Sequence, residues 1–166
     1  MERGDFGDSL SNPWRIDAPE YSFMSPLPFS ALSRSEPLAV VVADDVVEIQ
    51  QLLQLWLGDI GCVVTCVSTG REAVRLLRTQ HVDVVITDVL MPDGDGLEII
   101  SELKRRQTPV RVLAISGGGN HLRAIECLKF AKGLGAHGLL MKPFNRQQLL
   151  DALGLVLSAD GTSTTI

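Results

Sequence analysis

The sequence of 166 residues has few cysteines, few aromatic side chains, no long hydrophobic run and no excess of positive charge. Its three cysteines, Cys62, Cys66 and Cys127, lack the CxxC spacing of zinc or redox sites, and an odd number cannot all pair in disulfides. We therefore expect reduced cysteines that serve in packing. The formal net charge of −5 disfavours nucleic acid and anionic membranes as main partners, because both would repel the chain.

Segments that would insert into a membrane or direct secretion are also missing from the sequence. No window approaches the roughly 18 consecutive apolar residues of a membrane span. The N-terminal region lacks the basic start and apolar run of a signal peptide. Because 45% of the residues are hydrophobic, the chain can still form a core of its own. These features predict a cytoplasmic protein with one folded domain.

The chain changes in character at Pro37. Residues 1–36 hold four of the eight prolines, five of the eight aromatic residues, and six acidic residues against three basic ones. The prolines interrupt any helix or central strand, so we expect an extended or disordered N-terminal arm. The alternative is that the aromatic side chains of this arm dock on the domain or on a partner. Residues 158–166 form a short Ser/Thr/Gly segment, which predicts a flexible tail after a domain of residues 37–157.

Within the predicted domain, five apolar strands alternate with five helices. The strands are expected at 38–43, 62–67, 82–87, 110–115 and 137–141, and the helices at 46–59, 71–78, 96–106, 122–134 and 146–157. The inward face of the first helix is predicted from the spacing of Ile49, Leu52, Leu53, Trp56 and Leu57. Short continuous apolar strands are typical of a parallel sheet with helices on both faces. The sequence therefore predicts a flavodoxin-like, doubly wound α/β sandwich with strand order 2-1-3-4-5.

Polar residues follow or end four of the predicted strands. Asp44 and Asp45 follow the first strand, Asp88 the third, Ser116 the fourth and Lys142 the fifth. Each has an ordinary structural explanation when taken alone, such as a helix N-cap, a turn residue or a solvated lysine. Ligands of open parallel sheets bind outside the carboxyl ends of the strands, where these residues would meet. Their coincidence favours one pocket that holds carboxylates, a hydroxyl and an ammonium group.

Further residues complete a recognisable set around these positions. The set consists of Asp44-Asp45, Asp88, Met91-Pro92, Asp93-Gly94, Ser116 and Lys142-Pro143-Phe144. With this set the chain resembles, over about residues 38–157, the receiver domain of bacterial two-component response regulators. The resemblance implies that Asp88 accepts a phosphoryl group from a sensor histidine kinase or a histidine phosphotransfer protein. It also implies that the protein is not an enzyme toward other substrates and catalyses only its own phosphorylation and dephosphorylation.

The resemblance also implies a Mg²⁺ cofactor. Mg²⁺ prefers oxygen ligands and keeps several waters, which suits the carboxylates of Asp45 and Asp88. By resemblance the backbone carbonyl of Leu90 is a third ligand, and Asp44 contributes indirectly. Lys142 would neutralise charge on the phosphoryl oxygens, and Ser116 would donate a hydrogen bond to one of them.

Three features depart from the usual receiver pattern, and one of them is the N-terminal arm, which the core fold does not require. Ser116 and Lys142 are 26 positions apart, which is longer than in most receivers, and the extra residues lie within 117–121. We expect that loop to be mobile. Leu139 stands where receivers often carry a Tyr or Phe that moves inward on activation. We therefore expect the conformational signal to run through Ser116 and the loop after it.

The short C-terminal segment predicts a stand-alone, single-domain response regulator whose output is protein contact or onward phosphotransfer. A homodimer formed on phosphorylation is compatible with this prediction, and the downstream target is open. One alternative is a degenerate receiver that acts as an unphosphorylated interaction module. Another is a phosphohydrolase with an Asp nucleophile, which is disfavoured because the first strand ends in adjacent aspartates instead of a D-x-D pair.

Overall fold

The computed structural model describes residues 36–91, 96–117 and 121–158. The predicted N-terminal arm, apart from Glu36, lies outside the described residues, as do residues 159–166 of the predicted tail. Asp93-Gly94 and positions 118–120 of the predicted loop also lie outside them. Ser158 is the last residue of a helix, one position beyond the predicted end of the domain.

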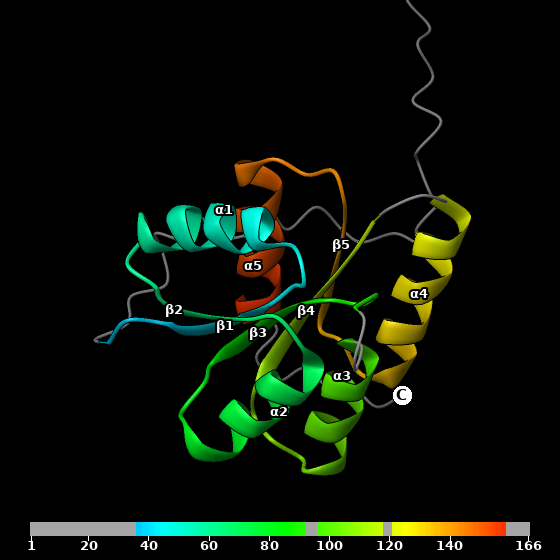
Figure 1. Cartoon of the computed structure of the whole chain (residues 1–166), viewed down its shortest axis with the longest axis horizontal. Coiled ribbons are helices and arrows are strands. Elements are labelled where there is room, and N and C mark those ends of the chain that lie inside the picture. Colours follow the sequence, from blue (N-terminus) through cyan, green and yellow to red (C-terminus); the bar gives the residue numbers. More distant parts are fainter. Residues whose placement is uncertain (1–35, 92–95, 118–120, 159–166) are drawn as a thin grey trace, which may run out of the picture.

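Five strands and five helices alternate along the described chain (Figure 1). Their bounds are β1 Ala39–Ala43, α1 Val47–Gly58, β2 Val63–Val67, α2 Gly70–Thr79, β3 Val84–Asp88, α3 Gly96–Arg105, β4 Arg111–Ser116, α4 His121–Leu134, β5 Gly138–Met141 and α5 Arg146–Ser158. Every element begins and ends within two residues of its predicted range. The predicted alternation of strand and helix is confirmed.

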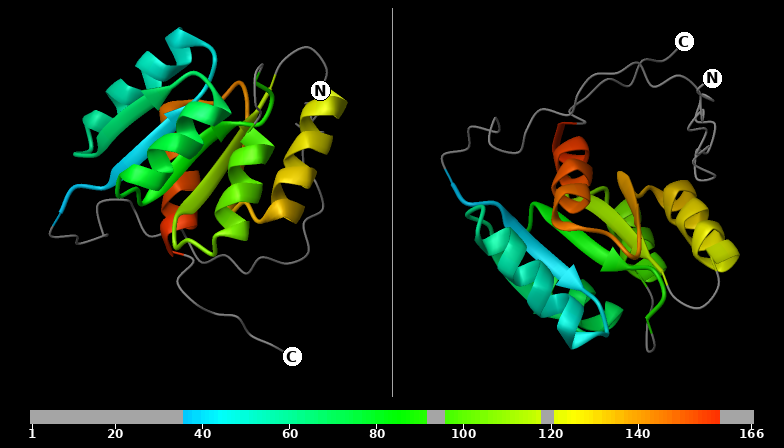
Figure 2. Two further views of the ribbon diagram at one scale, coloured as in Figure 1. Left: turned by 60° about the horizontal axis from the view of Figure 1, so that its bottom comes forward. Right: turned by 90° about the horizontal axis from the view of Figure 1, so that it is seen from above.

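The strands form one parallel sheet in the order β2-β1-β3-β4-β5, as the sequence predicts. Helices α1 and α5 cover one face, and α2, α3 and α4 cover the other (Figures 1 and 2). The register pairs Ala43 with Thr87, and Ser116 with Met141. The carboxyl ends of β1, β3, β4 and β5 are therefore neighbours at one edge of the sheet.

Each face of the sheet packs against its helices in a separate hydrophobic cluster. Successive side chains of a strand point to opposite faces, so Val40 and Val42 of β1 enter one cluster and Val41 enters the other. The α1/α5 cluster also contains Leu53 and Leu149. All five residues of β3 are buried, which explains the apolar run Val84, Val85 and Ile86 at its start.

The first helix turns one predicted core residue outward. Leu53 and Leu57 are 1% and 0% exposed, whereas Leu52 is 37% exposed. Leu53 and Leu57 are one turn apart and face the sheet, and Leu52 is rotated by about 100° from Leu53. The prediction that Leu52 belongs to the inward face is therefore wrong.

Among the described residues, no helix combines the length and the apolar character that crossing a membrane requires.

Candidate functional site

The buried polar side chains of the described chain gather at the carboxyl edge of the sheet. They are Asp44, Thr87, Asp88 and Ser116, each at most 5% exposed. Asp44 follows β1, Thr87 and Asp88 end β3, and Ser116 ends β4. The strand order brings these positions side by side although they are far apart in the sequence. The structure thus brings together residues that the sequence places at strand ends.

Lys142 connects two of the carboxylates. Its Nζ atom lies 2.7 Å from Oδ2 of Asp44 and 2.6 Å from Oδ2 of Asp88. Its backbone N–H donates to the carbonyl of Ser116 at 2.8 Å, which fixes the residue at the end of β4. With only 18% of its side chain exposed, the ammonium group is a partly buried counter-charge that both aspartates share.

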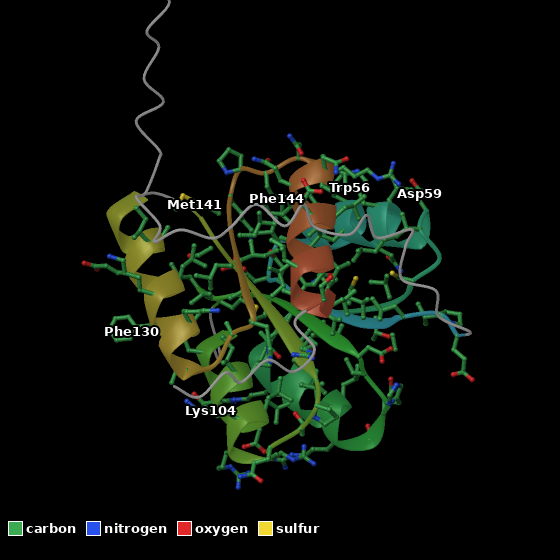
Figure 3. The ribbon with its side chains drawn as sticks, turned by 180° about the vertical axis from the view of Figure 1, so that it is seen from behind. Trp56, Asp59, Lys104, Phe130, Met141 and Phe144 are labelled. Atoms are coloured by element: carbon green, nitrogen blue, oxygen red, sulfur yellow. The ribbon has the colours of Figure 1, made fainter. Side chains whose placement is uncertain are left out.

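The residues that follow Lys142 anchor it to the α1/α5 layer. The Lys142–Pro143 peptide bond is cis, and Phe144 packs edge-on against Trp56 of α1 with 6.4 Å between the ring centroids. Figure 3 shows the two rings beside the start of α5. The aromatic residue of the Lys-Pro-Phe sequence therefore serves in packing, while the lysine points into the site.

Burial and charge shift the pKa values of Asp88 and Lys142. Burial raises the pKa of the Asp88 carboxyl, and hydrogen bonds from Lys142 and from the N–H of Leu90 offset this only in part. Burial alone would lower the pKa of Lys142, but its hydrogen bonds to Asp44 and Asp88 and their charges outweigh that effect and raise it. Lys142 therefore keeps its proton at neutral pH, while the ionised form of Asp88 is disfavoured.

The two buried carboxylates are held in the same way. Oδ1 of Asp88 accepts the backbone N–H of Leu90 at 2.9 Å, and Oδ1 of Asp44 accepts that of Val46 at 2.9 Å. In each residue the second oxygen faces Lys142. Neither Asp44 nor Asp45 is the N-cap of α1; that position belongs to Val46, which makes no side-chain cap bond. The ordinary capping explanation for these aspartates is therefore excluded.

Asp45 differs from its neighbour because it is exposed. The carboxylates of Asp44, Asp45 and Asp88 each offer an oxygen, and these oxygens lie within 4.8 Å of one another. Among the described residues, no hydrogen bond reaches the Asp45 side chain. Several carboxylate oxygens at one edge match the preference of Mg²⁺ for hard oxygen ligands, so the donor set fits the predicted ion.

Ser116 is fully buried, and its hydroxyl has no hydrogen-bond partner in the described structure. A buried hydroxyl without a partner is uncommon and costs free energy, since it has lost its bonds to water. Ser116 lies at the end of β4 beside Lys142. The hydroxyl is therefore free to bond an oxygen atom of a ligand that enters the site.

Two positions beside the site are glycines, and neighbouring atoms leave no room for a side chain at either of them. A Cβ at Gly117 would collide with Cβ of Lys142, and one at Gly96 would collide with the carbonyl oxygen of Asp88. Any larger residue at these positions would displace one of the two groups. The glycines therefore preserve the positions of Lys142 and Asp88.

The structure adds one residue to the site, Gln50, which no sequence pattern predicts. The amide nitrogen of Gln50 donates to the carbonyl oxygen of Asp44 at 2.6 Å. Nothing in the sequence distinguishes Gln50 from Gln51 and Gln54, which are exposed on the same helix.

Leu139, which stands where receivers often carry an aromatic residue, is 38% exposed.

Comparison with known proteins supports the resemblance. The family model of the response regulator receiver domain matches residues 40–154. The chain is 32% identical over 118 residues to the probable transcriptional regulator ycf27 of Guillardia theta, a match that covers 71% of this chain and 44% of that protein. It is 28% identical over 118 residues to the regulatory protein AtoC of Escherichia coli, which covers 71% of this chain and 24% of AtoC. The matched region is therefore less than half of either relative.

Solved structures show the same fold. The chemotaxis protein CheY4 of Vibrio cholerae superposes with a TM-score of 0.63 at 30% identity, covering 72% of this chain and 98% of that one. A putative response regulator from Chloroflexus aurantiacus gives a TM-score of 0.65 at 27% identity, covering 74% and 98%. Together with the match over residues 40–154, these likenesses establish that the chain belongs to the response regulator receiver domain family.

Proposed function

We propose that this protein acts in two-component signalling by accepting a phosphoryl group on Asp88 from a histidine kinase or a histidine phosphotransfer protein. The observation that carries the proposal is the partly buried ammonium group of Lys142 between Asp44 and Asp88, with the Asp45 carboxylate beside them. A carboxylate that attacks a phosphoryl group must overcome charge repulsion, so positioned positive charge is what the reaction needs. Family membership supports the same role.

The proposed Mg²⁺ site consists of the carboxylates of Asp45 and Asp88 and the backbone carbonyl of Leu90. Asp44 acts indirectly, as family membership implies, and its two oxygens bond the N–H of Val46 and the ammonium group of Lys142. When bound, Mg²⁺ neutralises charge on the phosphoryl oxygens and on the attacking carboxylate. Asp45 is suited to bind Mg²⁺ directly, because its carboxylate is exposed and forms no hydrogen bond with any described residue.

In the proposed reaction, one Asp88 carboxylate oxygen forms a bond to phosphorus while the bond from phosphorus to the donor histidine nitrogen breaks. The N–H of Leu90 holds Oδ1 of Asp88 in place. Lys142 moves its hydrogen bond from Asp88 to a phosphoryl oxygen, and Asp44 keeps the ammonium group oriented. The unpartnered hydroxyl of Ser116 donates to another phosphoryl oxygen.

The proposed outcome is a shift between two conformations, which is read by protein contact or by onward phosphotransfer. The protein is a signalling module whose only catalysis is its own phosphorylation and dephosphorylation. A reducing compartment such as the cytoplasm fits the three free cysteines, Cys62, Cys66 and Cys127.

Phosphoryl transfer can be tested by intact mass after incubation with acetyl phosphate, with and without Mg²⁺. We expect one phosphoryl group on the wild type with Mg²⁺ and none on Asp88→Asn. The matched control Asp151→Asn, on the exposed surface of α5, should label like the wild type. No label on the wild type with Mg²⁺ would favour an unphosphorylated interaction module. Consumption of acetyl phosphate without label would favour a phosphohydrolase.

A further inference from the structure

The side chain of Gln50 joins the ends of two strands beside the carboxylates. Gln50 lies in the first part of α1, and its Nε2 atom is 2.6 Å from the carbonyl oxygen of Asp44. The same nitrogen lies 3.2 Å from the carbonyl oxygen of Val67 and 3.1 Å from Oγ of Ser68, at the end of β2. A side-chain amide has two hydrogens to donate, so three acceptors compete for them. The short distance assigns one hydrogen to Asp44.

The bond to Asp44 fixes the peptide unit that links Asp44 to Asp45. The N–H of Asp44 donates to the carbonyl oxygen of Val67 at 3.2 Å, so the backbone of Asp44 is held on both sides. The carbonyl that Gln50 holds belongs to the peptide bond that leads into Asp45. Rotation of that peptide would turn Asp45 relative to Asp44 and Asp88.

Asp45 depends on this backbone because its side chain has no support of its own. Asp44 and Asp88 are held by Lys142 and by backbone N–H groups. The Asp45 carboxylate is exposed, and no hydrogen bond within the described residues reaches it. Its direction is therefore set by the main chain at Asp44 and Asp45.

We propose that Gln50 is a positioning residue that orients Asp45 for Mg²⁺ by holding the carbonyl of Asp44. This inference rests on the proposed function, because it assigns Asp45 to the metal. Residues behind metal ligands commonly hold them in the binding geometry, and their loss weakens affinity. If Gln50 only joined α1 to β2, its replacement would lower the stability of the protein. The Mg²⁺ affinity of the folded protein would then stay unchanged.

The first test is Mg²⁺ binding to the full chain by calorimetry. Gln50→Leu and Gln50→Met remove both donors, and we expect the Kd to rise about tenfold, the lower end of the effect of such residues. Gln54→Leu replaces an exposed glutamine on the same helix and should bind like the wild type. Ser68→Ala removes one acceptor but keeps the bond to Asp44, and it should also bind like the wild type. Equal Kd values for the wild type and the folded Gln50 variants would overturn the inference.

A second test uses the wild type alone, so it does not depend on the folding of a variant. In an NMR titration with Mg²⁺, the side-chain amide signals of Gln50 should shift with the same saturation curve as the backbone of Asp45. The amide signals of Gln51 and Gln54 should stay in place. A Gln50 amide that does not respond while Asp45 does would overturn the positioning role alone. A wild type that binds no Mg²⁺ would overturn the proposed metal site and this inference with it.

Discussion

The two ends of the sheet use polar side chains in different ways. At the amino end, Oδ2 of Asp83 accepts the N–H of Ala39 at 2.9 Å, and Nδ1 of His137 accepts that of Val112 at 3.0 Å. These side chains satisfy backbone groups where strands begin. At the carboxyl end, Asp44 and Asp88 share one ammonium group and Ser116 has no partner in the described structure. The amino end is thus arranged for stability, whereas the carboxyl end holds like charges that folding alone does not require.

This difference separates the effects of substitution at the two ends. Removing an acceptor at the amino end leaves a strand N–H unbonded and should only destabilise the fold. Removing a carboxylate at the carboxyl end relieves repulsion and burial of charge, so stability can rise while the proposed function is lost. The comparison can be tested by variants at both ends, from the largest expected effect to the smallest.

The largest effect is expected from Lys142→Met. This change leaves the carboxylates of Asp44 and Asp88 buried without their counter-charge. Breaking a buried ion pair by removing one partner costs about 3 kcal/mol or more. Urea denaturation in metal-free buffer should show this loss, whereas Lys104→Met on the exposed surface of α3 should lose little. Equal losses for the two variants would show that the Lys142 bridge does not stabilise the fold.

Asp88→Asn and Asp83→Ala should change stability in opposite directions. Burial raises the folded-state pKa of Asp88, so the fold favours the protonated form. The protonated Asp88 carboxyl therefore stabilises the fold at pH values below the ordinary pKa of 3.8. This stabilisation is lost as the pH rises through the higher pKa of Asp88 in the folded protein. Melting curves in metal-free buffer should therefore place Asp88→Asn above the wild type at pH 7 and close to it near pH 4.

Asp83→Ala provides the counterpart at the amino end. It leaves the N–H of Ala39 without its acceptor and should lower the free energy of unfolding by about 1 kcal/mol. Melting curves of Asp83→Ala in the same metal-free buffer at pH 7 measure this loss of stability. A stabilised Asp83→Ala or a destabilised Asp88→Asn at pH 7 would contradict the distinction between the two ends.

Asp45→Asn should weaken Mg²⁺ binding and leave the metal-free fold almost unchanged. The Asp45 side chain is exposed and bonds no described residue, so its loss should change stability by less than about 0.5 kcal/mol. Because mass action makes Mg²⁺ raise the melting temperature of any form that binds it, that rise should shrink in the variant. A full Mg²⁺ response in Asp45→Asn would exclude this residue as a ligand.

The smallest stability effect is expected from Ser116→Ala. The variant removes a buried hydroxyl that has no partner in the described structure, so the free energy of unfolding should stay within about 0.5 kcal/mol or rise slightly. Binding of beryllofluoride, a mimic of the phosphoryl group, should become weaker because one donor is gone. A clearly destabilised variant would indicate that the hydroxyl already has a structural partner.

The sequence was sufficient to predict the fold because its strongest signals are local. β3 and β4 are short apolar runs that end in the polar residues Asp88 and Ser116, so the sequence indicates both the strands and their ends. The different burial of Asp44 and Asp45 could not be predicted from local sequence, because the burial of Asp44 at 1% beside an exposed Asp45 depends on the path of the chain out of β1. The part played by Gln50 depends on the close approach of α1 to the end of β2, which no local pattern encodes.

The most direct test of the account is to locate the phosphoryl group. The wild type is labelled with acetyl phosphate and Mg²⁺, and the acyl phosphate is reduced with borohydride, which converts the modified aspartate to homoserine. Peptide mass spectrometry then identifies the converted position. We predict homoserine at position 88 alone. Conversion at Asp44 or Asp45, or none at any aspartate of a protein that carries the label, would contradict the assignment of Asp88 as the phosphoacceptor.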